Sequence, residues 1–202
     1  MTDDFKNLLT ASLPREGWCS EEKALKLAEL LMEKQPKVCV EVGVFGGRSL
    51  VPQALTLKEI GQGGHITGID PWTLDAALDG GIGQENEEWW KNNVNLEDIY
   101  RGFIEAVLNL KLTFECRWIR ARSEWAVNLF RDGEVDWLHL DSNHSEEVSC
   151  RDVHLWSPKM AAKSIWIMDD TDWPSQAVAL ERIKALGYQT THDAGNYQVL
   201  VR

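Results

Sequence analysis

The stretch VCVEVGVFGGRS, residues 38–49, carries the pattern that decides the predicted fold of this sequence. Its first six residues form a short apolar run, typical of a strand buried on both faces of a parallel sheet. Glycines follow, and a helical pattern extends over residues 49–60. A strand, a glycine turn and a helix in this order direct backbone N–H groups toward a ligand at the helix amino end. The alternative is a tight turn that binds nothing.

Strand and helix patterns continue to alternate along the chain. Strand-like runs recur at residues 65–70, 117–121, 136–141, 164–170, 188–192 and 196–201, and helical patterns at 146–156 and 176–186. Before the first strand, Ser20 can cap a helix that has acids in its first turn and stops at Pro36. The alternation predicts an α/β fold with a mostly parallel seven-stranded sheet, helices on both faces and an antiparallel C-terminal hairpin.

One long segment, residues 73–112, interrupts this alternation. It begins with a loop that holds three glycines, passes Trp89 and Trp90, and ends in an expected amphipathic helix around Phe103. A long glycine-containing insertion at the carboxyl end of a strand is typical of a lid over a site. A surface excursion packed against the sheet is the alternative. We expect one domain, residues 1–202, that includes this insertion.

The composition limits the classes of partner. Of 202 residues, 44% are hydrophobic and 26% are charged, the balance of a soluble globular protein with a sizeable core. The formal net charge of -11 argues against nucleic acid and anionic membranes, which attract clustered Lys and Arg. The N-terminus lacks a signal-peptide pattern, so we expect a cytoplasmic protein and allow for a homo-oligomer. The four cysteines form no CxxC pair and are expected to be small buried side chains.

The glycine turn differs from the common phosphate-binding loops. It has neither the GxGxxG spacing of dinucleotide folds nor a Gly-Lys-Ser/Thr sequence. Glu41 would repel a pyrophosphate and favour a cationic amine. Asp70 ends the second strand, where doubly wound folds use an acid to bind ribose hydroxyls. These features indicate an adenosine-containing ligand, although an Asp before Pro71 could instead form a turn.

Three aspartates follow two successive predicted strands. Asp141 ends one strand, and Asp169 and Asp170 end the next. If the strands are neighbours, the carboxylates converge at one edge of the sheet and repel one another unless a cation lies between them. Oxygen ligands suit magnesium, with manganese or calcium as alternatives. In the other interpretation, two of these acids cap helices and the third is solvated.

His144 lies in the loop that follows Asp141. Its imidazole can take a proton near neutral pH, and a hydroxyl beside a metal ion is acidified. These properties suit a general base, whereas a helix cap or a metal ligand are the alternatives. His139 lies inside a strand and is expected to belong to the core.

Seven of the ten tryptophans fall into two groups. Those near the predicted ligand edge or in the insertion are Trp72, Trp89, Trp90 and Trp173. Their rings suit stacking on an adenine, an aromatic acceptor or a sugar, and equally suit core packing. Trp118, Trp137 and Trp166 lie inside strands and are expected to be core residues.

With these residues assembled, the sequence resembles the class I S-adenosylmethionine-dependent methyltransferases. Within them it is similar to the branch of catechol O-methyltransferase and the magnesium-dependent sugar and macrolide O-methyltransferases. The resemblance covers nearly the whole chain and rests on EVGVFGGRS, GIDPW, ARSEW, DSNHSEEVSCRDVHLW and IMDD. It implies a Rossmann-like methyltransferase fold and two cofactors, S-adenosylmethionine and magnesium.

The resemblance also implies roles for individual residues. The cofactor residues it implies are Glu41, Gly43, Phe45 and Ser49 around methionine and ribose, Asp70 at ribose, Trp72 and Ser123 near adenine, and Asp141. It further implies Asp141, Asp169 and Asp170 as metal ligands and His144 as the base. The catechol enzymes have a lysine at the position of this base, so His144 favours a sugar or natural-product acceptor.

The resemblance therefore predicts an O-methyltransferase that acts on a hydroxyl of a small sugar, natural product or catechol-like molecule. The resemblance does not extend to the sequence of the insertion, so the acceptor stays open. A metal-dependent hydroxylase or hydrolase on the same scaffold is an alternative, since some members of the branch are named cephalosporin hydroxylases. Redox-iron sites usually combine two histidines with one carboxylate, whereas acids outnumber histidines here. A non-catalytic adenosine-binding protein is the third hypothesis.

Overall fold

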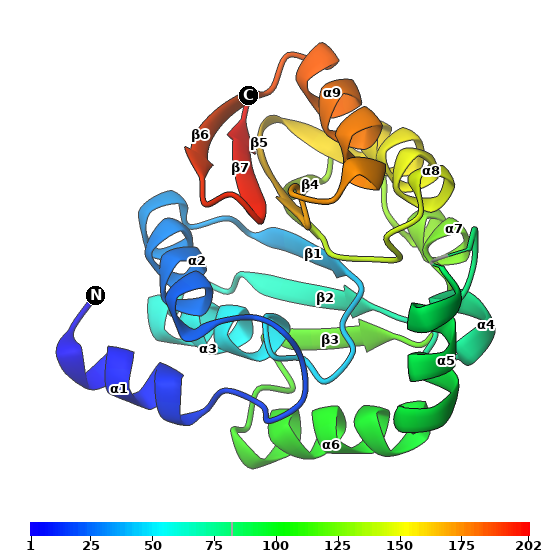
Figure 1. Cartoon of the computed structure of the whole chain (residues 1–202). Helices are drawn as coiled ribbons and strands as arrows, with labels where there is room; N and C mark the ends of the chain where they lie inside the picture. The colour runs from blue at the N-terminus through cyan, green and yellow to red at the C-terminus, as the bar shows by residue number, and fades with distance from the viewer. Residues whose placement is uncertain (82) are drawn as a thin grey trace.

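The computed structural model describes residues 1–81 and 83–202 and has the predicted α/β fold (Figure 1). A single sheet holds seven strands in the order β3-β2-β1-β4-β5-β7-β6. The pairs from β3 through β5 are parallel, and β7 pairs antiparallel with both β5 and β6. The predicted C-terminal hairpin is therefore confirmed. Residue 82, within the predicted insertion, lies outside the described residues.

The strands match the predicted runs closely. They are β1 (Val38–Val42), β2 (His65–Ile69), β3 (Cys116–Ile119), β4 (Val135–Leu140), β5 (Met160–Asp169), β6 (Gln189–Asp193) and β7 (Tyr197–Val201). Because β1 pairs with both β2 and β4, and β4 pairs with β5, the strand ends that carry the predicted site residues are neighbours.

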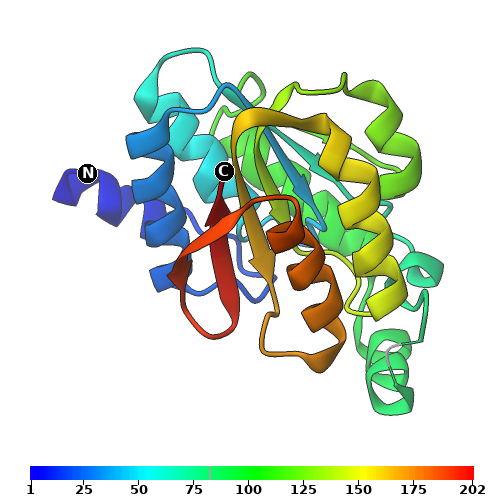
Figure 2. The ribbon, with the colours of Figure 1, turned by 90° about the horizontal axis from the view of Figure 1, so that it is seen from above.

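Helices cover both faces of the sheet. They are α1 (Asp3–Ala11), α2 (Glu21–Lys34), α3 (Leu50–Ile60), α4 (Leu74–Ala77), α5 (Gln84–Asn93), α6 (Leu96–Asn109), α7 (Ser123–Ala126), α8 (Glu146–Trp156) and α9 (Ala177–Ala185). Figure 2 shows α2 and α3 on one side of the strands and α8 and α9 on the other. Ser20 caps α2 as predicted, its side chain accepting a hydrogen bond from the backbone of Lys23. The sequence pattern did not predict α1. Within the described residues, no helix is long and apolar enough to cross a membrane.

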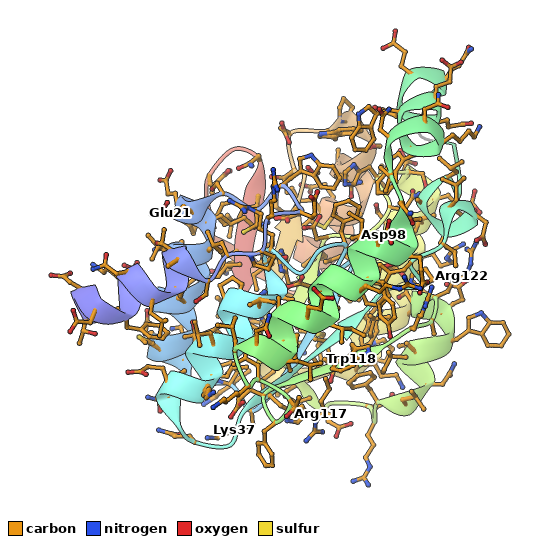
Figure 3. All side chains as sticks on the ribbon, turned by 90° about the horizontal axis from the view of Figure 1, so that it is seen from below. Glu21, Lys37, Asp98, Arg117, Trp118 and Arg122 are labelled. Carbon is orange, nitrogen blue, oxygen red and sulfur yellow. The ribbon has the colours of Figure 1, made fainter. Side chains whose placement is uncertain are left out.

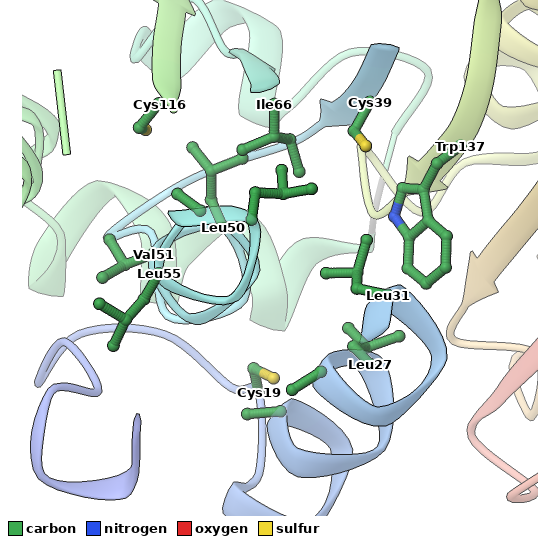
Figure 4. Packing of buried hydrophobic residues seen from close by; sticks show 14 of the residues in the cluster. Cys19, Leu27, Leu31, Cys39, Leu50, Val51, Leu55, Ile66, Cys116 and Trp137 are labelled. Carbon is green, nitrogen blue, oxygen red and sulfur yellow. The ribbon is translucent and has the colours of Figure 1, made fainter. Parts of the chain in front are cut away.

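The period-two alternation of the strands separates two hydrophobic cores. Cys39 and Trp137 face α2 and pack against Leu27 and Leu31 (Figure 4). Residues on the opposite face, such as Leu138, pack toward α8 and α9. All four cysteines are buried and free, as expected.

The strand tryptophans agree with the prediction at two of three positions. Trp137 and Trp166 are fully buried in the central strands. Trp118, labelled in Figure 3, is only half-buried, because its strand β3 lies at the edge of the sheet and one side stays open to solvent.

The predicted insertion contains two different kinds of structure. Its second half is α6, whose Phe103 and Val107 are fully buried in the core, so the amphipathic prediction is confirmed there. Its first half holds α4 and α5, which have no buried residue. Arg122, labelled in Figure 3, pairs with Asp75 and Asp79 and so ties this first half to the segment after β3.

Candidate active site

A cavity of about 580 Å³ opens at the carboxyl ends of the parallel strands. This edge is the usual place for a ligand in open α/β sheets. The segments after β1, β2, β4 and β5 all line it, as do α4, α5 and the lead-in to α2. The predicted site residues that line it are Gly43, Phe45, Ser49, Asp70, Ser123, Asp141, His144, Asp169 and Asp170. Glu41 and Trp72 are not among the lining residues.

Gly43 allows the ends of β1 and β4 to approach one another. Its φ is +89°, and a Cβ atom at this position would lie 1.8 Å from the carbonyl oxygen of Asp141. The backbone N–H of Asp141 donates to Val42 at 2.9 Å, which fixes the spacing of the two segments. Only glycine fits such a contact, so Gly43 places the cofactor loop directly beside the first metal-ligand candidate.

Asp70 holds the glycine turn in shape. Its Oδ2 accepts the backbone N–H groups of Val44 and Phe45 at 2.9 and 3.0 Å, and its Oδ1 accepts that of Trp72 at 2.7 Å. Burial raises the pKa of Asp70, against the lowering effect of these backbone bonds. The turn-forming role proposed as an alternative is therefore present. A carboxylate has about four acceptor positions, so Oδ1 keeps one for a further donor such as a ribose hydroxyl.

Trp72 belongs to the support of this turn. It is 2% exposed, its Nε1 donates to the carbonyl of Phe45 at 2.8 Å, and its ring stacks on Phe103 at 5.6 Å. Trp72 thus acts as a core residue that fixes the Phe45 backbone, whose φ is +51°. Direct contact with an adenine would require this packing to open.

Glu41 lies beneath the turn in a buried polar network. Its side chain is fully buried; Ser49 donates to Oε1 at 2.7 Å, and Gln53 donates to Oε2. Nδ1 of His139 lies 2.9 Å from the same Oε2. The carboxylate therefore faces the protein interior, and its route to a cofactor runs through Ser49, which lines the cavity.

His139 and Lys23 both contact Asp169. Nε2 of His139 lies 3.2 Å from Oδ2 of Asp169, and the Lys23 ammonium contacts the same oxygen. Burial alone would lower the pKa of Lys23 and of His139. Asp169 and Asp141 nevertheless raise the pKa of Lys23 above its ordinary value, and Asp169 and Glu41 do the same for His139. Burial alone would raise the pKa of Asp169, but Lys23 and His139 lower it. The Lys23 ammonium and the contact with His139 thus hold Asp169 ionised.

Two sets of donor atoms could hold a metal ion here. His139, Asp141 and Asp169 form the buried set, and Asp141, His144 and Asp170 the open one, each with its ligand atoms within 4.8 Å of one another. The three predicted aspartates therefore divide between two sets, with Asp141 in both. Among the described residues, Oδ1 of Asp169 is buried and has no hydrogen-bond partner. Burial and the neighbouring carboxylate of Asp169 raise the pKa of Asp141 well above its ordinary value. This excess of negative oxygen ligands fits a divalent cation.

His144 stands at the open side of the cluster. Its Nε2 lies 2.8 Å from Oδ2 of Asp170, and its side chain is 34% exposed. The Trp173 ring lies 4.7 Å from the imidazole, edge-on. A carboxylate that orients an accessible imidazole at the wall of a cavity is the arrangement expected for a general base.

Ser123 lies at the start of α7 and lines the cavity. Its hydroxyl accepts a hydrogen bond from Nε1 of the buried Trp156 at 2.8 Å. The neighbouring Asp152 accepts the hydroxyl of Ser142 at 2.8 Å and also lines the cavity. Burial raises the pKa of Asp152 to about 6, although hydrogen bonds from Ser123 and Ser142 lower it in part.

Aromatic rings from three segments gather at the mouth of the cavity. Trp18 lies 4.8 Å from Phe45 and 6.2 Å from Trp90, measured between ring centroids. Trp89 packs at 6.0 Å on the same Trp18. Trp18 and Trp89 are 69% and 45% exposed. The lead-in to α2 and the first half of the insertion thus meet over the cofactor loop.

Sequence reasoning missed three of these residues. The sequence pattern singles out neither Lys23 nor Trp18, and it assigns His139 only to the core. His139 is indeed fully buried, but it also joins Glu41 to Asp169. Only Lys23 has a local signal in the sequence. It directly precedes Ala24, the first residue of the apolar side of α2, and this position indicates a buried lysine.

Comparisons with known proteins agree with this fold. Residues 40–171, more than half of the chain, match a family model described as a methyltransferase domain. The O-methyltransferase NovP is 15% identical over 98% of both chains, with a TM-score of 0.71. The SAH-bound methyltransferase PaMTH1 of Podospora anserina is 11% identical over 99% of this chain and 88% of its own, with a TM-score of 0.67. TomG of Streptomyces achromogenes, an O-methyltransferase of tomaymycin synthesis, is 14% identical over 100% and 91%, with a TM-score of 0.61.

A search of curated protein sequences found no match. The solved structures, all far below 25% identity, establish the shared architecture, which is the Rossmann-like methyltransferase fold expected from the resemblance. The family match goes further than architecture. The chain belongs to the methyltransferase-domain family.

Proposed function

We propose that this protein is an S-adenosylmethionine-dependent O-methyltransferase that methylates a hydroxyl of a small molecule with the help of a divalent metal ion. One observation carries the proposal: a single cavity is lined by the glycine turn after β1, by Asp70, and by the acidic cluster with His144. Donor and acceptor sites in one cavity are what a direct transfer requires. Two of the similar structures are described with the cofactor or its product, TomG with SAM and PaMTH1 with SAH, which supports the choice of donor.

The residues at the turn would bind the cofactor. Gly43, Phe45 and Ser49 line the cavity, and the free acceptor position of Asp70 suits a ribose hydroxyl. Ser123 lies near the adenine in this arrangement. Glu41 acts as a positioning residue, because it reaches the cavity only through Ser49.

The reaction is an in-line displacement. The acceptor oxygen forms a bond to the methyl carbon while the carbon–sulfur bond breaks, and S-adenosylhomocysteine leaves with the electron pair on sulfur. His144 takes the proton of the acceptor hydroxyl, and Asp170 holds the resulting imidazolium. A divalent ion held by Asp141 together with Asp169 or with Asp170 would supply Lewis acidity that makes this hydroxyl easier to deprotonate. The first half of the insertion would close over the cavity as a lid.

Labelled S-adenosylmethionine tests this proposal directly. Hydroxylated sugars, catechols and polyketides would be screened with and without magnesium, and we expect label transfer that a chelator abolishes. Asp141→Ala should abolish metal-dependent transfer while calorimetry still detects binding of S-adenosylhomocysteine. Asp193→Ala, an exposed acid at the end of β6, is the control and should transfer normally. Normal transfer by Asp141→Ala in the presence of chelator would disprove the metal part of the proposal.

A hydroxylase would differ in one simple requirement. Methyl transfer consumes no oxygen, so label transfer should be unchanged in an anaerobic assay. A product that gains oxygen and no label, or binding of S-adenosylhomocysteine with no turnover on any acceptor, would favour the alternative hypotheses.

A further inference from the structure

Lys23 is an unusual residue at the acidic cluster. It lies in the first turn of α2, its side chain is only 8% exposed, and its ammonium contacts Oδ2 of Asp169. The Tyr197 ring lies 5.3 Å from Nζ and covers it from the β7 side. Lysine is almost never fully buried unless it is paired. Lys23 is therefore held in place by Asp169, a contact between residues 146 positions apart.

The charges around Asp169 explain why a lysine is present. Asp141 and Asp169 belong to one set of carboxylate and imidazole donors, and Asp170 belongs to the overlapping set. Among the described residues, the Lys23 ammonium and Nε2 of His139 both contact Asp169. A divalent ion at the same carboxylates would place two further positive charges beside the ammonium, and like charges at that distance repel strongly.

We propose that Lys23 is an internal counter-ion that competes with the divalent metal for Asp169, so that metal binding exchanges the lysine contact for a metal contact. The inference rests on the proposed function, which supplies the metal ion, and it names Lys23 as the residue that sets the affinity of the site for this ion. Lys23 also lines the cavity, so its ammonium has open space to enter when it leaves Asp169. The exchange makes the metal-free protein stable and makes its affinity for the metal moderate.

Calorimetric titration with Mn²⁺ alone tests this exchange on the full chain. Lys23→Met removes the charge and leaves an unbranched side chain of similar length, and Lys23→Arg keeps the charge. Lys34→Met is the matched control, because it removes the same charge from an exposed site at the other end of α2. We expect Lys23→Met to bind Mn²⁺ at least about tenfold more tightly than the wild type, because the ion no longer has to displace an ammonium from Asp169. Lys23→Arg and Lys34→Met should stay close to the wild type.

Thermal unfolding of the same variants gives a second readout that needs no turnover. Without metal, Lys23→Met should unfold at a lower temperature than the wild type, because the buried Asp169 loses its lysine counter-ion. Added Mn²⁺ should raise its Tm by more than it raises that of the wild type. A variant that folds only when Mn²⁺ is present would support the same conclusion.

The outcomes separate this inference from the proposed function. Equal or weaker Mn²⁺ binding by Lys23→Met, with clear binding by the wild type, would overturn the role of Lys23 and leave the metal-dependent enzyme intact. Tighter binding by Lys23→Arg as well would also overturn it, because packing and not charge would then be the cause. An absence of binding by every variant would overturn the metal part of the proposed function, and the exchange with it.

Discussion

Nδ1 of His139 lies 2.9 Å from Oε2 of Glu41, and both side chains are completely buried. The contact joins the base of the cofactor turn to the acidic cluster, because the other nitrogen of the same imidazole faces Asp169. Two parts of the site that bind different ligands thus share one buried hydrogen-bond chain. Such a chain stabilises the fold only while every member keeps its partner.

Removing Glu41 should therefore be costly. Glu41→Ala removes one of the two carboxylates that contact His139 and leaves only Asp169. Removing one partner of a buried ion pair lowers the free energy of unfolding by about 3–5 kcal/mol. Glu41→Gln keeps an acceptor oxygen and should lose less. Urea unfolding measures both, with the exposed Glu59→Ala as control, which should stay within about 0.5 kcal/mol of the wild type. A loss for Glu41→Ala no larger than that of the control would contradict the role of the network.

A glycine substitution tests the close approach of β1 and β4. Gly43→Ala would place Cβ 1.8 Å from the carbonyl oxygen of Asp141, so the strand end must shift or the fold must fail. Gly63→Ala is the matched control: its φ is also positive, +74°, but nothing lies within 4 Å of the added Cβ. We expect Gly63→Ala to cost about 1–2 kcal/mol from backbone strain alone. In thermal unfolding, Gly43→Ala should be far less stable than Gly63→Ala, and similar Tm values would refute the close contact.

Asp152 should make stability depend on pH. Its pKa rises from 3.8 to about 6 in the fold, because burial disfavours the charge. Folding thus favours the protonated form: the contribution of this group is complete below pH 3.8 and is lost as the pH rises through 6. Asp152→Asn cannot ionise, so its stability relative to the wild type should increase by about 2 kcal/mol between pH 4 and pH 7.

Urea unfolding at several pH values measures this difference. Asp132→Asn, at an exposed surface ion pair with Lys159, serves as control and should show a much flatter difference. A pH-independent difference between Asp152→Asn and the wild type would show that the carboxylate is solvated in the fold.

The fold was predictable because its signals are local. Apolar runs and the glycines between them give the strands, and six of the seven strands begin within one residue of their predicted position. The strand β5 begins four residues earlier than its predicted run, at Met160, because the exposed Ala162 and Lys163 do not have an apolar pattern. The short helix α1 was missed, since a cap at Thr2 and only two buried residues, Phe5 and Leu9, make a weak pattern.

The site was predictable where it depends on topology. Parallel strands bring Asp141 and Asp170 to one edge wherever β4 and β5 are neighbours, and His144 follows in the same loop. Contacts chosen by packing could not be foreseen. Lys23 meets Asp169 only because α2 folds back on the strands from 146 residues away, and no local pattern records such a partner.

Trp18 offers a last test, because the chain contains a nearly identical exposed tryptophan elsewhere. Trp18 is 69% exposed and contacts Phe45 and Trp90 at the mouth of the cavity, whereas Trp125 is 70% exposed on α7 and does not line it. An aromatic pair contributes about 0.5–1.5 kcal/mol beyond its burial. Trp18→Ala should therefore weaken binding of S-adenosylhomocysteine by roughly two- to tenfold, because Phe45 loses its cover. Trp125→Ala should bind like the wild type, and both variants should unfold at similar temperatures. Equal affinities in calorimetry would show that the lead-in to α2 does not contribute to the cofactor site, and would leave Trp18 a role only toward the acceptor.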